Sequence, residues 1–571
     1  IDKIHQPEKD EIILTVRSPG CGSSRLLISA NARWARMHIT GRKIVNPPNP
    51  PAFCMLLRKH LEGGKIKRIS QVDFDRIVHI EIEALDEFRE WRPRILICEF
   101  MGKHSNIILV NPESNNIIDA IKKYNSEVSS FREVLPGKTY LRPPEQGKLN
   151  PLEASYDDFA DLMYRGGENM ELARSLFRCF SGFSPFSCRE SCVQAGLDPD
   201  MPLEHCGEYE LSTLYQQIKK LLQQLREPLL QSEVVYKQNY PLEFAPYPIH
   251  SLAVGKRECF NSIMEACQSY FDARIDIARL DSAKANVYKH IRAILDKFWR
   301  KKFFQEGDLK QAQENERYRL WGELLTAYAY RIEKGQKTVS LEDFYSGEKV
   351  DIELDPRLNA IQNAQRFFKI YNKSTKTIKH LETLMSRNQN EIDYLESVLV
   401  AIEQAESPLD LEEITEELEK EHYLKGKTKK GKASITHSQP RRYISSDGYP
   451  ILVGRNNRQN DFLTIKQAEK NDLWLHTKEV PGTHVIVKLP PRITSIHEVP
   501  DATLLEAAAL AAHFSKASEA DKVAVDYTFR SNVKKPGGSR PGMVVYESYW
   551  TVMVNPRSID PERLLASPEP T

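Results

Sequence analysis

The sequence lacks the features that mark secreted, membrane-spanning and strongly charged proteins. Its nine cysteines form no CxxC pair, which favours reduced thiols in a cytoplasmic protein. No apolar run approaches the roughly 18 residues that span a bilayer, and the mean hydropathy is −0.50. Eighty Lys and Arg stand against 79 Asp and Glu, so any nucleic-acid contact must come from local patches. We therefore expect a soluble, cytoplasmic chain without a membrane partner.

Signatures of cofactor and metal chemistry are also missing. The chain has no GxxxxGK[ST] phosphate loop, no GxGxxG after a strand, and neither HExxH nor GxSxG, so an ATP- or GTP-driven machine is not expected. Four cysteines fall in one stretch beside His205, namely Cys179, Cys188, Cys192 and Cys206. Their spacing matches no common zinc pattern, so buried thiols are the favoured interpretation and neither a cofactor nor a metal site is predicted.

The 571 residues divide into a multidomain α+β protein. Residues 1–148 are rich in strand signals, such as RIVHIEIE at 76–83, and contain one expected helix at 52–61. Residues 149–245 are typical of short helices. Within them, the FSGFSP turn at 180–185 resembles a helix-hairpin-helix module, whose turn can offer backbone N–H groups to phosphate. A plain connection between two helices remains the alternative.

Residues 256–408 carry the clearest pattern, which predicts a long antiparallel coiled-coil arm with a small tip at 335–356. Apolar positions recur by three and four along two stretches, as in a heptad seam. The seams consist of Ile277, Leu280, Lys284, Val287, Ile291, Ile294 and Phe298, and of Ile378, Leu381, Met385, Asn388, Ile392, Leu395, Leu399 and Ile402. A polar Asn388 inside the seam is a usual device for fixing register. An ordinary helical bundle is the alternative.

The remainder of the chain is predicted to contain a linker, a second α+β domain and a tail. Residues 424–442 form a basic linker, which is either a solvated run or a tether that lies along phosphates. Residues 443–556 mix strand signals, including one at 462–466, with a helix at 502–516. Residues 557–571 are expected to be disordered.

Two clusters of candidate functional residues lie in the N-terminal domain. Asp75 and Arg76 open a predicted strand, where they form either a weak surface ion pair or a reader of phosphate and base edges. The second cluster consists of Glu99, Met101, Gly102, Lys103 and His104, around a glycine turn that follows a strand. Such a turn binds an anion or RNA, or merely satisfies its own backbone.

A third cluster, in the C-terminal domain, combines aromatic rings with a basic Gly/Pro loop. Its members are Trp474, His476, His484, Tyr527, Lys534, Lys535, Arg540 and Tyr546. Rings beside cations suit single-stranded or folded RNA through stacking and phosphate contact. The histidines could also be metal ligands, but no carboxylate or thiol stands at ligand spacing, so buried or hydrogen-bonded histidines are favoured.

Longer motifs add a resemblance to a known family. DLWLHTKEVPGTHVIV (472–487) and VKKPGGSRPGMVVY (533–546) resemble the two motifs of the NFACT-R domain. PPAFCMLLRKHLEGG (50–64), FDRI (74–77) and EFMGKHSNIILV (99–110) resemble the NFACT-N domain. With these motifs in this order, the chain resembles the RqcH/NEMF family of ribosome quality-control factors, some bacterial members of which are called fibronectin-binding proteins.

The resemblance implies a binding factor and not an enzyme. Family members bind a large (50S) ribosomal subunit that still holds a stalled peptidyl-tRNA, contact rRNA, and recruit alanyl-tRNA. The stalled chain then receives an untemplated C-terminal alanine tail that marks it for degradation. The resemblance also implies a small RNA-binding partner, RqcP. It carries tRNA binding over to Asp75, Arg76, Glu99, Met101 and Gly102, and RNA or ribosome binding to Lys103, His104, Trp474, His476, His484, Lys534, Lys535 and Arg540.

Two other functions stay open at this point. A strand-rich domain followed by a helix-hairpin-helix-like segment also resembles the layout of DNA-repair glycosylases. Their chemistry uses a terminal proline amine and a glutamate, whereas this chain starts with Ile1 and Asp2, after the position of an early aspartate that the family carries. A fibronectin-binding surface adhesin is suggested only by the family's alternative name.

Overall fold

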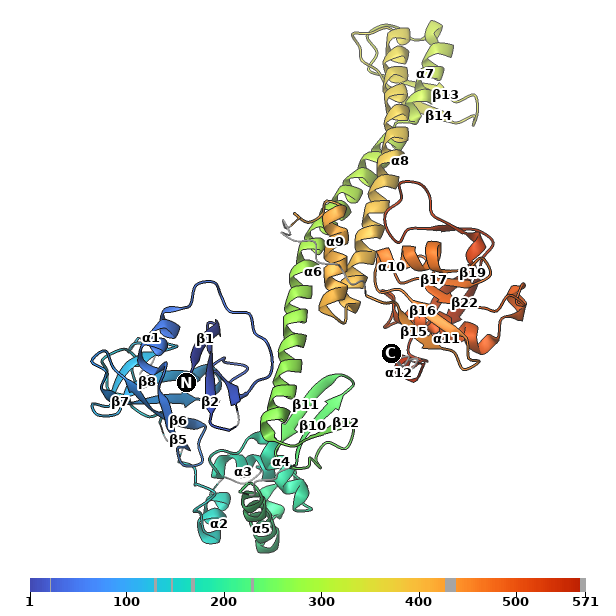
Figure 1. The fold of residues 1–571 in the computed structure, drawn as a ribbon. Helices are drawn as coiled ribbons and strands as arrows, with labels where there is room; N and C mark the ends of the chain where they lie inside the picture. The colour runs from blue at the N-terminus through green and yellow to red at the C-terminus, as the bar shows by residue number, and fades with distance from the viewer. Residues whose placement is uncertain are drawn as a thin grey trace. The chain divides into compact units, whose positions relative to one another are not determined.

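The computed structural model of the chain describes residues 1–20, 22–127, 131–144, 147–165, 170–226, 231–426 and 438–564. They form two compact units, Ile1–Ala278 and Arg279–Thr571, coloured along the chain in Figure 1. Each unit has buried hydrophobic cores of its own. Within the described ranges, no helix combines the length and the apolar character that a bilayer crossing requires.

Two antiparallel sheets and one helix form the N-terminal part of the first unit. The first sheet has the order β1-β2-β3-β4, with β1 (Lys3–Glu8), β2 (Glu11–Ser18), β3 (Gly22–Ser29) and β4 (Arg36–Ile39). The second has the order β5-β6-β7-β8-β9, with β5 (Lys65–Gln71), β6 (Ile77–Leu85), β7 (Trp91–Glu99), β8 (Asn106–Asn111) and β9 (Asn116–Ala120). Helix α1 (Ala52–Leu61) shares one core with both sheets, to which Ile12, Leu57 and Ile80 contribute. The strand-rich prediction and its helix at 52–61 are confirmed.

The strand register of the second sheet decides which loops meet at its edge. Ile77 at the start of β6 lies opposite Glu99 at the end of β7, and Glu99 lies opposite Asn106 at the start of β8. The turn before β6 and the loop between β7 and β8 therefore lie side by side, although some 25 residues separate them in the sequence.

Short helices follow, as predicted, but end earlier than expected. They are α2 (Tyr156–Tyr164), α3 (Leu172–Cys179), α4 (Pro185–Gln194) and α5 (Glu208–Gln224). The helical segment expected to reach residue 245 then gives way to β10 (Ser232–Lys237), β11 (Tyr240–Ala245) and β12 (Lys256–Phe260), in the order β11-β10-β12. A strand suits this segment because the adjacent Val234 and Val235 are buried in two different cores, on opposite faces of β10.

The second unit contains the predicted antiparallel coiled coil. Helix α6 (Ile263–Glu314), from Arg279 onward, packs against α8 (Ala360–Gln404). Asn388 lies in the seam and its Nδ2 donates to the carbonyl oxygen of Phe298 at 3.1 Å. Lys284 also fits the seam, because its Nζ donates to the carbonyl oxygens at the end of α8. Both polar seam residues thus find backbone partners that fix the pairing.

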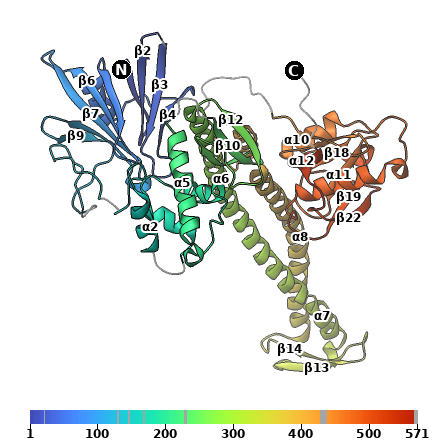
Figure 2. The ribbon, with the colours of Figure 1, turned by 90° about the horizontal axis from the view of Figure 1, so that it is seen from below.

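A small domain occupies the far end of the paired helices (Figures 1 and 2). It consists of α7 (Arg317–Ala327), β13 (Thr338–Glu342) and β14 (Lys349–Glu353), which form a hairpin where the tip was predicted. Leu325, Ile352 and Phe367 lie in its core.

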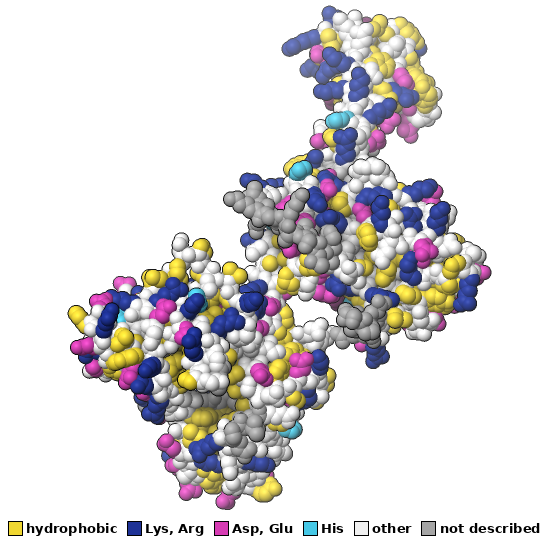
Figure 3. Space-filling view, in the orientation of Figure 1, with side chains coloured by type: hydrophobic (Ala, Val, Ile, Leu, Met, Phe, Trp, Pro, Cys, Tyr) yellow, Lys and Arg dark blue, Asp and Glu magenta, His cyan; other side chains and the backbone are white. Residues whose placement is uncertain are grey.

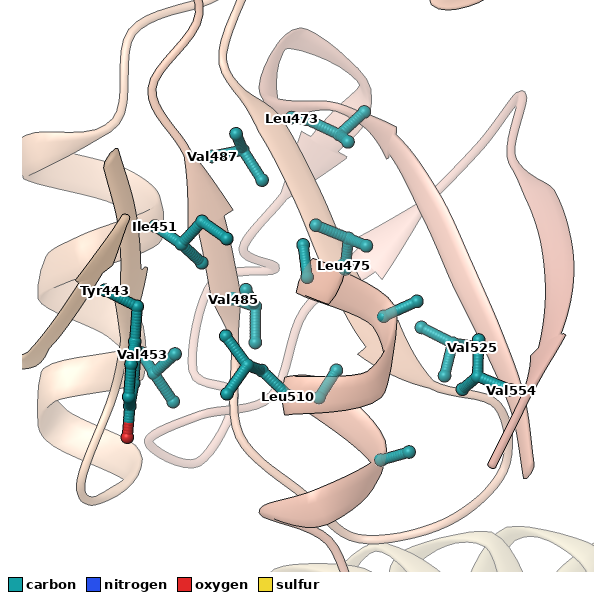
Figure 4. Close-up of a cluster of buried hydrophobic side chains, with 14 of the residues drawn as sticks. Tyr443, Ile451, Val453, Leu473, Leu475, Val485, Val487, Leu510, Val525 and Val554 are labelled. Atoms are coloured by element: carbon teal, nitrogen blue, oxygen red, sulfur yellow. The ribbon is translucent and has the colours of Figure 1, made fainter. Parts of the chain in front are cut away.

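Helix α9 (Pro408–Lys420) leads to the C-terminal α+β domain. Its elements are β15 (Arg441–Ile444), β16 (Pro450–Val453), α10 (Asn457–Asp461), β17 (Leu473–Thr477), β18 (Val485–Val487), α11 (Asp501–His513), β19 (Val523–Phe529), β20 (Val533–Lys534), β21 (Val545–Tyr546), β22 (Trp550–Val554) and α12 (Pro561–Leu564). Six strands form a sheet in the order β15-β16-β18-β17-β19-β22. Figure 4 shows Leu510 of α11 against Val485 and Leu475 of this sheet, in the core of the domain.

Three expectations for this region need correction. Residues 462–466 form a helical turn and not a strand, because Leu463 and Thr464 are buried and the Thr464 carbonyl accepts from Arg530 Nε at 2.6 Å. Arg441 of the predicted linker opens β15 and is bound by Glu406. The linker cations between 427 and 437 lie outside the described residues, as do residues 565–571 of the predicted tail. The preceding tail residues are ordered and include α12.

Candidate RNA-binding sites

The two candidate clusters of the N-terminal domain form one site at the edge of the second sheet. The turn that carries Asp75 and Arg76 and the loop from Phe100 to Ser105 are joined by a hydrogen bond from Phe100 N–H to the Arg76 carbonyl, at 2.9 Å. We call these two segments, residues 72–76 and 99–105, the edge site.

Asp75 and Arg76 play different parts in the edge site. The Asp75 carboxylate is half-buried and accepts from the Arg76 backbone N–H at 2.7 Å, while the Asp75 carbonyl accepts from Gln71 Nε2 at 2.7 Å. Asp75 N–H donates to Val72. The turn is therefore well ordered. The Arg76 side chain is exposed, and its guanidinium has no hydrogen-bond or ion-pair partner in the described part of the chain. It is free to bind an anion.

Glu99 lies beneath the edge site and not on its surface. Its carboxylate is fully buried and binds Arg132 through two hydrogen bonds of 2.8 and 2.5 Å, and it also accepts from the Tyr140 hydroxyl at 2.9 Å. Burial and the Glu99 charge both raise the pKa of Tyr140. Glu99 therefore holds the end of β7 in place and has no surface of its own to offer RNA. Arg132 and Tyr140 carry no motif that could have identified them in the sequence.

The remaining residues of the loop present two side chains to solvent. Gly102 has a φ of +58°, a conformation that favours glycine. Met101 is half-buried, and its N–H donates to Ser105 Oγ at 2.8 Å. Lys103 and His104 are both exposed. Of the residues predicted to bind tRNA, only Arg76 is exposed; Lys103 and His104, predicted to bind RNA or the ribosome, are exposed in the adjoining loop.

The hairpin formed by helices α3 and α4 packs directly against the edge site. Phe74, from the same turn as Arg76, approaches the hairpin so closely that a Cβ on Gly182 would lie 2.3 Å from the Phe74 carbonyl oxygen and 2.4 Å from Cδ1. The Phe74 and Phe183 rings lie 6.3 Å apart. The glycine of the FSGFSP turn is therefore a packing requirement, which the plain-connector and phosphate-binding interpretations both missed.

Lys148 adds a cation where the hairpin meets the edge site. Its Nζ lies 4.1 Å from the centre of the Phe177 ring, in a cation–π contact. Burial lowers its pKa, and the positive charge of Arg76 lowers it further, whereas Asp75 raises it. These mutual effects place Lys148 within electrostatic reach of the Asp75-Arg76 pair. Sequence analysis did not single it out.

The neighbouring cysteines are structural. Cys179, Cys188, Cys192 and Cys206 are buried in the core of the hairpin domain. Burial raises the pKa of Cys179 and of Cys192 to about 12. Across the residues described, no three His, Cys, Asp or Glu side chains group as metal ligands.

Trp474 is a core residue and not a stacking platform. It is fully buried, packs with Leu463 and Ile486, and lies 4.8 Å from the Tyr546 ring. Its Nε1 is buried, with no partner among the described atoms. The prediction that Trp474 stacks on RNA is wrong for this conformation, because alternation along β17 points it into the second core of the domain.

The two candidate histidines lie beside Trp474. The His476 and His484 rings are 5.5 Å apart and nearly perpendicular. His484 Nδ1 and the Thr464 hydroxyl are 2.7 Å apart, and burial lowers the pKa of His484 to about 3. Burial also lowers the pKa of His476, which is half-buried. Both rings are therefore neutral at physiological pH and give RNA no positive charge.

The basic Gly/Pro loop has one largely exposed cation and two that are bound more closely. Lys534 is 71% exposed in its side chain and lies 3.9 Å from Glu547. Lys535 is bound by Asp461. Arg540 is bound by Glu421 and, at 2.8 Å, by Glu391 of α8. Arg540 therefore docks the loop onto α8 and the end of α9, whereas Lys535 ties the loop to α10. The RNA-binding roles of Lys535 and Arg540 stay predictions.

Sequence analysis missed the aromatic side chains that do reach the surface of this domain. Trp550 is 41% exposed and lies opposite Tyr527 across β22 and β19, with ring centres 6.2 Å apart. Tyr549 is also exposed, and Lys478 Nζ lies 5.6 Å from its ring centre. In this domain, exposed rings lie at Tyr549, beside a cation, and at Trp550, whereas Trp474 is buried.

The base of the coiled coil holds one unusual acid. Glu417 of α9 is 2% exposed and accepts hydrogen bonds from the Tyr394 hydroxyl at 2.9 Å and from Asn457 Nδ2 at 3.3 Å. Burial raises its pKa to about 7, although both hydrogen bonds oppose the shift. Glu417 thus titrates where α9 meets the C-terminal domain.

Comparison with known proteins assigns the family. Residues 1–436 match the NFACT N-terminal and middle domains, and residues 439–547 match the NFACT protein RNA binding domain. The chain is 36% identical over 560 residues to the Rqc2 homolog RqcH of Bacillus subtilis, covering 97% of this chain and 94% of the relative. It is also 36% identical over 558 residues to the Rqc2 homolog RqcH of Streptococcus suis, with the same coverage.

Solved structures show similarity to separate parts of the chain. The C-terminal part of the fibronectin/fibrinogen-binding protein from Streptococcus suis is 32% identical, with a TM-score of 0.40, and covers 50% of this chain and 100% of that one. Its N-terminal part is 31% identical, with a TM-score of 0.39, and covers 48% and 91%. From the matches along nearly its whole length, the chain belongs to the NFACT family, in its RqcH/Rqc2 ribosome quality-control group, and carries that family's RNA-binding domain.

Proposed function

We propose that the chain binds large (50S) ribosomal subunits that hold stalled peptidyl-tRNA, and that it recruits a further tRNA through the edge site. The observation that carries this proposal is the free guanidinium of Arg76 next to the ordered carboxylate of Asp75. A guanidinium offers paired donors to phosphates and base edges, and a carboxylate accepts from exocyclic amines. Lys103 and His104 extend this exposed surface.

The recruited tRNA is alanyl-tRNA, and the product is an untemplated alanine tail that marks the stalled chain for degradation. In this proposal the ribosome forms the peptide bonds, and the chain acts in the cytoplasm as a positioning factor without a cofactor. Exposed cations around a rigid turn suit this role, because phosphate contacts position an RNA while base contacts select it.

Other surfaces secure the complex. We assign rRNA contact to the RNA-binding domain, through Lys534, Tyr549 and Trp550, since rings beside cations bind unpaired RNA. The tip of the coiled coil contacts the large subunit, and a small RNA-binding protein of the RqcP type is the expected partner.

The test is the RNA that co-purifies with variants of the full chain. Asp75→Ala/Arg76→Ala should retain large-subunit rRNA, lose the enriched tRNA and abolish alanine tailing. The matched control is Glu87→Ala/Arg89→Ala, which removes the same pair of charges from exposed residues of the turn between β6 and β7. That control should behave as the wild type.

A double variant that keeps its tRNA and its tailing would refute the role of the edge site. Release of damaged bases from duplex DNA by the purified chain would instead support a glycosylase. Labelling of the chain on intact cells would support an adhesin.

A further inference from the structure

The basic Gly/Pro loop between β20 and β21 places its arginine in a pocket at the base of the coiled coil. Opposite charges are interspersed over the surface of the second unit (Figure 3), so a cation near an acid is common there. Arg540 differs, because its guanidinium is bound by two carboxylates at once, Glu391 of α8 and Glu421 at the end of α9. It also lies 5.6 Å from the ring centres of both Tyr394 and Tyr423. We call these two acids and two tyrosines the arginine pocket.

The arginine pocket offers Arg540 the contacts that an RNA strand would offer. Two carboxylates around a guanidinium resemble the paired contacts that arginine makes with phosphate. The rings of Tyr394 and Tyr423, whose centres are 5.8 Å apart, provide faces for cation–π contact, as bases do. Burial alone would lower the pKa of Arg540, but its hydrogen bonds to Glu391 and Glu421 raise it. The pocket therefore stabilises the charged side chain and occupies the donors that phosphate would use.

The loop is held firmly at its two ends and loosely between them. At one end Lys535 is bound by Asp461 of α10, and at the other Met543 packs into the core at the base of the coiled coil. Residues 536–539 are exposed, and a Cβ on either glycine of this turn would meet nothing within 4 Å. Arg540 supplies the contact that draws the turn onto α8. Loss of that contact would free the turn while both ends stay attached.

The rest of the domain is attached to the coiled coil by separate, buried contacts. Asn456 Nδ2 donates to the Glu413 carboxylate of α9 at 2.8 Å, and both residues are buried. The Arg441 side chain is 4% exposed and lies 3.0 Å from Glu406. Release of Arg540 leaves these contacts in place. The loop can therefore leave the arginine pocket without the domain leaving the coiled coil.

From this geometry we infer that the arginine pocket masks Arg540, and that RNA bound by this domain draws the arginine away from Glu391 and Glu421 onto phosphate. The exchange replaces one anionic partner of the guanidinium by another. The mask lowers the affinity for RNA in proportion to the fraction of chains whose loop is free. It limits indiscriminate binding, because an RNA must repay the lost contacts. The inference rests on the proposed function only for the identity of the RNA as ribosomal.

The first test removes the mask from the full chain. Glu391→Gln/Glu421→Gln takes away both carboxylates, and the control Glu113→Gln/Glu153→Gln removes two exposed acids from the first unit. The affinity for a fluorescein-labelled RNA hairpin is measured by anisotropy, and thermal melts followed by circular dichroism check that each variant folds. A loop that is docked about nine-tenths of the time lowers the apparent affinity about tenfold. Adding Arg540→Gln to the unmasked variant should remove the gain.

We expect the unmasked variant to bind the hairpin about tenfold more tightly than the wild type, and the control to bind it as the wild type does. Equal gains in the two variants would mean that only net charge matters and would overturn the inference. No gain, or a gain that survives Arg540→Gln, would also overturn it.

A second measurement does not depend on the unmasked variant. Spin labels on Ser539→Cys of the loop and Ser386→Cys of α8, both exposed positions, report the distance between the two segments in a chain whose Cys21 and Cys259 are replaced by serine. Saturating hairpin should lengthen this distance, and an unchanged distance would overturn the inference.

The outcomes separate this inference from the proposed function. If neither the gain nor the longer distance is seen while the wild-type chain still co-purifies with large-subunit rRNA, the masking fails and the proposed function stands. If both are seen while the wild-type chain brings no ribosomal RNA from cells, the proposed function fails and the masking stands.

Discussion

Replacing Gly182 by alanine tests how the hairpin supports the edge site. The added Cβ would lie 2.3 Å from the Phe74 carbonyl oxygen and 2.4 Å from Phe74 Cδ1. Backbone hydrogen bonds from Val72 N–H to Ile77 and from Asp75 N–H to Val72 hold the Phe74 turn, so the carbonyl cannot yield easily. The substitution must therefore push the two segments apart.

The expected destabilisation has two parts. Gly182 has a φ of +76°, and an alanine in that conformation costs about 1 kcal/mol. The steric overlap adds about 1–3 kcal/mol, as in an overpacked core. Gly196 is the matched control, because its φ is +74° and its Cβ would meet nothing within 4 Å. Gly196→Ala should therefore show only the cost of placing an alanine at a positive φ.

The assay follows the unfolding of the full chain by differential scanning calorimetry, together with recovery of tRNA. Gly182→Ala should lower the transition that contains the first unit by more than Gly196→Ala does, and it should also reduce the co-purified tRNA because Arg76 is displaced with Phe74. Equal shifts for the two alanine variants would refute the close approach. A larger shift with tRNA recovery unchanged would refute the link to Arg76.

Three further predictions address individual side chains. Glu99→Gln leaves Arg132 buried without its charge partner. It should lower the free energy of unfolding in urea by about 3–5 kcal/mol. A decrease of less than about 1 kcal/mol would contradict the buried ion pair. The pKa of Glu417 is about 7 in the folded state, against 4.5 for an ordinary glutamate, so between these values only the folded state keeps the proton. Its stabilising contribution is complete below pH 4.5 and is lost as the pH rises through 7. Glu417→Gln should flatten this dependence between pH 5 and 8, and an unchanged profile would contradict the assignment. Trp550→Ala should weaken RNA binding, measured by anisotropy, by about 1–3 kcal/mol without unfolding the C-terminal domain. Trp474→Ala should instead destabilise that domain by about 3–5 kcal/mol in thermal melts. The reverse pattern would show that Trp474 is the residue that stacks on RNA.

Local patterns in the sequence predict the secondary structure correctly where residues close together in the sequence determine it. The heptad spacing identifies the coiled coil and the role of Asn388, and the helix at 52–61 has the predicted bounds. The helical prediction is wrong for residues 232–245. Segments distant in the sequence bury both faces of this stretch, which favours strands.

The structure shows which of the candidate residues reach the surface, and local patterns alone do not single these out from the buried ones. The resemblance identifies Asp75 and Arg76, and the structure leaves Arg76 free. It also suggests RNA contacts for Glu99 and Arg540, whose actual partners lie 33 and more than 100 residues away along the chain. Ion pairs of that separation depend on tertiary packing, and no local pattern encodes them.

The most direct test of the central claim is to purify the wild-type chain from cells, sequence the RNA that comes with it, and profile the ribosomal subunits. The account predicts large-subunit rRNA with little small-subunit rRNA, together with one enriched class of tRNA, expected to be that for alanine. Ribosomal RNA without any enriched tRNA would contradict the recruiting role of Asp75 and Arg76. Absence of ribosomal RNA altogether would contradict the proposed function.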